Sequence, residues 1–89
     1  MNKRLGFVGV IVARRELAGH AVNEVLSRFG GLILARTGLP CRHRRESVIT
    51  LVVEATTDEL GALTGALGQI AGVTVKSALA KEEGTAADT

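Results

Sequence analysis

Two helix-forming segments, each set between strand-forming segments, restrict the fold of this 89-residue sequence more than any other feature. Residues 5–13, 32–37, 47–55 and 73–79 are short runs rich in Val, Ile and Leu, as expected for strands. Between the first pair and between the last pair, apolar residues recur at helical spacing. The predicted order is strand, helix, strand, strand, helix, strand.

The helix boundaries are also visible in the sequence. An apolar stripe runs from Leu17 to Phe29, and Gly30-Gly31 is expected to end this first helix. Thr56 and Glu59 match a capping box at the start of the second helix, which Gly72 is expected to end. Residues 38–46, which contain the only Pro, are predicted to form a loop.

Two strand–helix–strand halves with right-handed crossovers predict a four-stranded antiparallel sheet with both helices on one face. The first and third strands are then central. This is an α+β, ferredoxin-like βαββαβ arrangement. Residues 1–80 are expected to form one such domain, and the small, polar residues 81–89 to form a disordered tail.

Composition limits the stability and the location of the chain. A chain of this size buries only about 60% of its unfolded surface, so association with a partner would add useful stability. The single Cys excludes an internal disulfide and fits a reducing cytoplasm. The apolar run at residues 5–13 is too short for a membrane span, and Arg14-Arg15-Glu16 follows it where a signal peptide would be cleaved. We therefore expect a cytoplasmic, unanchored protein.

Both faces of the central strands are apolar, although helices can cover only one. A second subunit is the favoured cover for the open face, and scattered exposed valines on a monomer are the alternative. The expected interface positions on the two strands are Val8, Val10, Val12, Val48, Thr50 and Val52.

The second helix has an uncharged, glycine-bearing stripe. Gly61, Gly65 and Gly68 lie away from its leucines, and no charged residue occurs between Glu59 and Lys76. Each Gly in a helix interior costs about 0.8–1 kcal/mol relative to Ala. The stripe therefore indicates either an interface with another subunit or tight packing between helix and sheet, and the pattern does not separate the two.

Residues 22–26 (VNEVL), 33–40 (ILARTGLP) and 61–73 (GALTGALGQIAGV) together resemble a small ACT-like family described as iron-only hydrogenase system regulators. The resemblance covers about residues 3–80. Its most specific parts are the run 61–73, followed by Val75-Lys76, and the R-x-G-x-P of residues 36–40. The family is similar in fold to amino-acid-binding ACT domains and to the ligand-sensing C-terminal domain of the nickel-responsive repressor. The resemblance implies a regulatory domain that forms homo-oligomers, either dimers or tetramers.

The resemblance also indicates where an effector would bind. In ACT domains the turn between the first strand and the first helix contributes to the effector pocket, which implies ligand contacts for Arg14, Arg15 and Glu16. Arg36 adds a further positive charge for an anionic ligand. The glycine-bearing turn of amino-acid-binding members is absent, so a small anionic effector is as consistent with the chain as an amino-acid-like one. A solvated turn is the alternative to any site here.

Cys41 and His43 are a soft and a borderline metal ligand two residues apart in the sequence. A transition metal needs about four ligands, so a site would require pooling across subunits. The flanking arginines oppose a cation. A solvated basic loop is therefore the alternative, and no cofactor is firmly implied.

Other function classes have less support. The pair His20 and Glu24 is possible on the first helix, but no nucleophile or pocket accompanies it, so we do not expect an enzyme. RNA binding through the sheet needs aromatic residues, and Phe7 is the only one in a strand. The net charge of +2 is modest, and the ribbon-helix-helix segment with which the nickel repressor binds DNA is absent. A regulatory homo-oligomer is favoured over an adaptor that binds another protein, and a small enzyme ranks last.

Overall fold

The computed structural model describes residues 2–41 and 43–81. The strands are β1 (Arg4–Val12), β2 (Ile33–Pro40), β3 (Ser47–Ala55) and β4 (Val73–Leu79). The helices are α1 (Arg15–Arg28) and α2 (Thr57–Gly68), with a short 3-10 turn, η1 (Gly30–Leu32), after α1. The predicted order of elements is confirmed. Residues 82–89 of the expected tail, which was predicted to begin at Lys81, lie outside the described residues.

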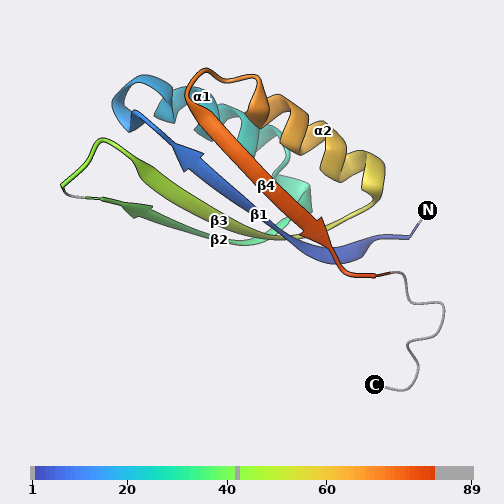
Figure 1. The fold of residues 1–89 in the computed structure, drawn as a ribbon. Helices are drawn as coiled ribbons and strands as arrows, with labels where there is room; N and C mark the ends of the chain where they lie inside the picture. The colour runs from blue at the N-terminus through green and yellow to red at the C-terminus, as the bar shows by residue number, and fades with distance from the viewer. Residues whose placement is uncertain (1, 42, 82–89) are drawn as a thin grey trace.

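The strands form one antiparallel sheet in the order β2-β3-β1-β4. As predicted, β1 and β3 are central, and both helices lie on the same side of the sheet (Figure 1). The opposite side is bare. This is the ferredoxin-like α+β fold expected from the sequence.

The core lies between the sheet and the helices. Val8 and Val10 of β1 and Leu51 and Val53 of β3 have no exposed surface. They pack against buried residues of α1 and α2, among which Leu26, Leu63 and Leu67 are the largest. Because aromatic residues are scarce, branched aliphatic side chains fill this core.

Strand β2 is longer than predicted. It continues through Gly38 to Pro40, where the sequence indicated a loop from residue 38. Proline is tolerated there because β2 is an edge strand and its outer side needs no amide donor. The helices also cover β2 least, since every residue of it after Ile33 is exposed.

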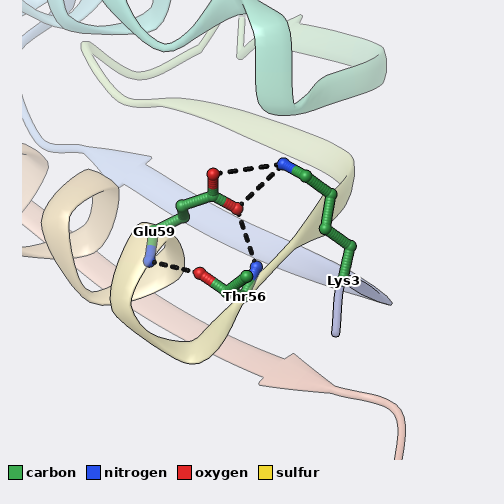
Figure 2. Close-up of polar contacts among 3 residues, drawn as sticks. All are labelled: Lys3, Thr56 and Glu59. Atoms are coloured by element: carbon green, nitrogen blue, oxygen red, sulfur yellow. Dashed lines mark hydrogen bonds and ion pairs between the residues drawn. The ribbon is translucent and has the colours of Figure 1, made fainter. Parts of the chain in front are cut away.

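The two ends of α2 differ in how well the sequence predicts them. The capping box is confirmed: Glu59 N donates to Thr56 Oγ1 at 3.1 Å, and Thr56 N donates to Glu59 Oε1 at 2.8 Å (Figure 2). At the other end the helix stops at Gly68, and residues 69–72 form a turn in which Gly72 has a φ of 80°. That left-handed conformation favours glycine.

Lys3 joins the N-terminal segment to the start of α2. Its Nζ lies 3.0 Å from Glu59 Oε1 and 3.1 Å from Oε2 (Figure 2). The hydrogen bond from the Thr56 amide, and then the one from Lys3, lower the pKa of Glu59 below its ordinary value. Glu59 therefore stays ionised while it caps the helix.

Gly6 is required by the close approach of β1 and β4. A Cβ at this position would overlap Ala78 O and the Leu79 side chain. By contrast, a Cβ at Gly9 of the same strand would meet only Lys76 O, at 3.9 Å.

Neither α1 nor α2 has the length and hydropathy needed to cross a membrane, and no other helix among the described residues has them.

Candidate functional site

Arg15 starts α1 and holds the β2–β3 loop against it. Its amide donates to Arg45 O at 3.0 Å. Its side-chain Nη1 lies within hydrogen-bond distance of three loop carbonyls, those of Cys41, Arg44 and Glu46, at 2.9–3.3 Å. One amide of the helix N-terminus is therefore occupied by the chain's own loop, and Arg15 has a structural role there.

Arg36 lies on β2, opposite Leu51 of β3 and near the middle of α1. Its Nη2 donates to Oδ1 of Asn23 at 3.1 Å. This bond links the edge strand to the helix across a region that no large apolar side chain fills. Asn23 was not among the predicted site residues, because on a helical wheel it belongs to the solvent-facing half.

A groove of about 280 Å³ separates α1 from β2 on the helix-covered side of the sheet. Val12, Val22 and Ile49 are apolar residues at its base, and the first two are almost completely buried. The remaining lining residues come from α1, β2 and the start of β3: Arg15, Gly19, Asn23, Arg36, Gly38, Leu39, Pro40 and Ser47. The groove exists because α1 covers β1 and β3 and leaves β2 exposed.

The groove brings together two of the four predicted ligand residues, Arg15 and Arg36. Among residues 2–41 and 43–81, these are the only charged residues of the lining, and none of the lining residues in these ranges is a carboxylate. Gly19 is central on the helix side, since Arg15, Gly19 and Asn23 are spaced four residues apart along one stripe of α1. No described atom lies within 4 Å of a Cβ built at Gly19 or at Gly38. The regular four-residue spacing is a signal in the sequence that could have identified this stripe.

The other two predicted ligand residues lie elsewhere. Arg14 borders a separate hollow of about 340 Å³ between the start of α1 and residues 70–72. Glu16 is exposed, and its Oε2 lies 3.9 Å from Arg45 Nε. The structure therefore does not join Arg14 and Glu16 to Arg15 and Arg36 in one site.

Cys41 and His43 both lie in the β2–β3 loop, where Cys41 is half-buried and His43 is exposed. In residues 2–41 and 43–81, no group of three His, Cys, Asp or Glu side chains is placed to hold a metal ion. The described part of the loop therefore does not form a metal site by itself. The metal site shared between subunits stays a prediction.

The open face of the sheet carries most of the large exposed apolar side chains. The prediction that placed Val8, Val10 and Val12 there is wrong, because these residues face the helices and are at most 1% exposed. Both faces of β1 are apolar, so alternation alone could not identify the buried one. Open-face positions that the sequence identified correctly on β3 are Val48, Thr50 and Val52. The exposed apolar residues of this face, at 41–68%, are Leu5, Phe7, Ile11, Leu39, Val48 and Val52.

Strand register arranges this face in rows that cross the sheet, and three of them span all four strands. One row contains Leu39, Val48, Ile11 and Thr74, and another contains Ala35, Val52, Phe7 and Ala78. Between them is a row of Thr37, Thr50, Gly9 and Lys76. Two mainly apolar rows therefore flank a row that is polar or lacks a side chain.

The glycine stripe of α2 faces away from the rest of the chain. No described atom lies within 4 Å of a Cβ built at Gly61, Gly65 or Gly68. Tight packing between helix and sheet, one of the two interpretations of this stripe, is therefore not the reason for these glycines. A role in an interface stays a prediction.

A protein-family model described as "TM1266-like: Iron-only hydrogenase system regulator, putative" matches residues 4–77. The solved structure of the uncharacterized protein TM1266 from Thermotoga maritima is 43% identical in sequence. That match covers 89% of this chain and 99% of the other, with a TM-score of 0.84. No curated protein matches the chain.

More distant structures share the fold. The ACT domain of GTP pyrophosphokinase from Chlorobium tepidum has a TM-score of 0.72 at 19% identity, and covers 85% of this chain and 99% of its own. The C-terminal domain of the MgtC protein from Mycobacterium tuberculosis has a TM-score of 0.69 at 15% identity, over 94% and 95% of the two chains. These likenesses support the ACT-like, ferredoxin-like architecture.

Proposed function

Because the chain belongs to the TM1266-like family of iron-only hydrogenase system regulators, we propose that it is a regulatory domain that acts as a homo-oligomer and binds a small effector. A regulator needs no catalytic group, and we propose no enzymatic activity. The cytoplasm is the location we propose, supported by the lone Cys in the sequence. The observation that carries the homo-oligomer is the uncovered apolar face of the sheet.

Burial of the exposed apolar side chains on this face would contribute a free energy comparable to the cost of association. Burying a Val, Leu, Ile or Phe side chain completely contributes about 1.5–3 kcal/mol. Side chains that are 41–68% exposed would each add roughly 1 kcal/mol, or about 12 kcal/mol for a pair of subunits. The estimated cost of association is about 4–15 kcal/mol, so burial of this face offsets most or all of it.

The arrangement of the rows favours a second copy as the partner. Suppose that a two-fold axis lies parallel to the sheet, above the middle row. The polar middle rows of the two subunits then face each other. The flanking apolar rows then face apolar rows of the partner. Gly9, at the centre of the middle row, leaves space for side chains from the opposite sheet. The face is therefore complementary to itself.

Sedimentation velocity with two matched variants tests this proposal. Ile11→Lys places a charge in the open face, where Ile11 is 45% exposed. Leu17→Lys makes a similar change on α1, where Leu17 is 69% exposed and outside the sheet face. We expect the wild type and Leu17→Lys to sediment as oligomers and Ile11→Lys as a monomer.

A monomeric wild type at micromolar concentration would refute self-association and favour the alternative, an adaptor that binds a different protein through the same face. Dissociation by Leu17→Lys alone would place the interface on the helices.

The regulatory role is tested by deleting the gene in a host that has an iron-only hydrogenase and measuring hydrogenase activity. Complementation with wild type and Leu17→Lys should restore the parental level, and complementation with Ile11→Lys should not. An unchanged level after deletion would contradict the regulatory role.

A further inference from the structure

We propose that the groove between α1 and β2 binds a small aliphatic carboxylate that carries no amino group, such as a short 2-oxo acid. This inference deepens the proposed function and rests on it for the biological role of the ligand. The site itself lies within one chain. The described residues of its lining belong to α1, β2 and the ends of β1 and β3.

The charge of the groove selects an anion. Arg15 lies at the end next to the β2–β3 loop, and Arg36 lies beside Asn23, two helical turns further along α1. A guanidinium group has five N–H donors. Among the described residues, only Nη1 of Arg15 and only Nη2 of Arg36 have side-chain hydrogen-bond acceptors. Both side chains therefore retain donors, and a carboxylate can accept two of them in parallel.

The same lining disfavours an α-amino acid. An ammonium group needs acceptors and gains from a nearby carboxylate, and no described residue of the lining is a carboxylate. The side-chain oxygen of Asn23 already accepts one hydrogen bond from Arg36. Ser47 supplies the other side-chain acceptor among the described lining residues, and the two guanidinium groups share the groove with it. An ammonium group would therefore gain few acceptors and would be repelled by the two arginines.

The shape and apolar lining set the rest of the ligand. Ligand pockets usually measure about 300–1,000 Å³, so a groove of about 280 Å³ admits a short molecule. Val12, Val22 and Ile49 offer apolar contact to an aliphatic body, which inorganic phosphate lacks. Gly19 keeps the middle of the groove open, because any side chain at this position would enter the unfilled space.

Amide chemical shifts recorded during titration test the site directly. The probes are sodium 2-oxoisovalerate, L-valine and inorganic phosphate, at matched ionic strength. We expect saturable shifts at the amides of Gly19, Gly38 and Ser47 with 2-oxoisovalerate in the millimolar range or tighter. L-valine and phosphate should each bind at least about tenfold more weakly, because one adds an unpaired ammonium and the other loses the apolar contacts.

Three variants assign the binding to the groove. Arg36→Gln removes a guanidinium that is exposed, and should weaken 2-oxoisovalerate binding about tenfold or more. Gly19→Leu should abolish binding while raising the melting temperature, since Leu is a better helix former than Gly, so a loss of binding is separable from unfolding. Arg44→Gln is the control: Arg44 pairs with Glu46 outside the groove, and its loss should leave binding unchanged.

The oligomerisation variant separates this inference from the proposed function. Ile11→Lys lies on the opposite side of the sheet, so a monomeric form of it should still bind 2-oxoisovalerate. Binding to the monomer together with failed complementation would support both proposals. The absence of saturable shifts with 2-oxoisovalerate, equal binding of L-valine, or undiminished binding by Gly19→Leu would each overturn the assignment of the site, whatever the oligomeric state.

Discussion

Replacing Thr56 with Ala tests how far one capping residue stabilises α2. The Thr56 hydroxyl accepts a hydrogen bond from Glu59 N at 3.1 Å, and the residue is only 9% exposed. Thr56→Ala removes this acceptor, so the amide of Glu59, the third residue of the helix, loses its hydrogen bond. The reciprocal bond, from the Thr56 amide to Glu59 Oε1, uses backbone atoms of residue 56 and remains.

The expected loss follows from known cap substitutions. Replacing a Thr N-cap with Ala costs about 1 kcal/mol, within a range of about 0.5–2 kcal/mol. For a domain of 60–100 residues, 1 kcal/mol corresponds to a change of roughly 4–8 °C in melting temperature. Thermal unfolding followed by circular dichroism would measure it. Protein concentration must be held constant, because the melting temperature of an oligomer depends on it.

Thr64→Ala provides a matched control on the same helix. The Thr64 hydroxyl donates to Gly61 O at 3.4 Å and caps nothing. Since Ala is the better helix former, this change should leave the melting temperature unchanged or slightly higher. Equal melting temperatures for the two variants would refute the capping argument, because the chemical change is the same at both sites.

Three further predictions concern glycines and ionisation. In the Ile11→Lys background, which we expect to be monomeric, Gly6→Ala should destabilise the chain by about 1–3 kcal/mol in denaturant unfolding because its Cβ would overlap β4, whereas Gly9→Ala should be neutral; equal effects would contradict the role assigned to the close strand approach. Gly65→Ala should raise the melting temperature by several degrees without changing sedimentation, and dissociation would instead place the α2 stripe in an interface. The folded-state pKa of Glu59 is below its ordinary value, so its stabilisation is present above that value and is lost as pH falls through the folded pKa. The difference in melting temperature between wild type and Glu59→Gln should therefore be largest near pH 7 and shrink in acid, and a difference independent of pH would contradict it.

Local signals predicted the fold well because each element carries its own. The capping box at Thr56 and Glu59 needs only residues three apart, and the structure confirms both of its hydrogen bonds. The end of β2 was missed because the tolerance for Pro40 depends on its being in an edge strand, which is a property of the sheet. The wrong prediction of which face of β1 is buried has a similar cause. Val8 and Phe7 are both apolar, and only the position of the helices decides which of them is buried.

The candidate site was less predictable because its residues act over long separations in sequence. Arg15 donates to carbonyls 26–31 residues away, and no spacing rule reveals such contacts. Arg14, its neighbour, is similar in sequence context but borders a different hollow. Charge and the position of the turn indicated residues 14–16, and of these only Arg15 lines the groove. They could not show which arginine faces the edge strand.

The polar half of α1 shows why a helical wheel underestimates a site. It places Gly19 and Asn23 with His20 and Glu24 as one solvent-facing surface. In the structure that surface has two parts: His20 and Glu24 are exposed, with His20 Nε2 3.8 Å from Glu24 Oε2, whereas Gly19 and Asn23 border β2. Hydrophobicity cannot separate the two parts, since neither is apolar. What separates them is that two helices are too few to cover four strands, so the edge strand leaves a groove beside α1. The uncovered strand and the uncovered sheet face both result from this shortage of covering elements, and they supply the ligand site and the oligomer interface that we propose.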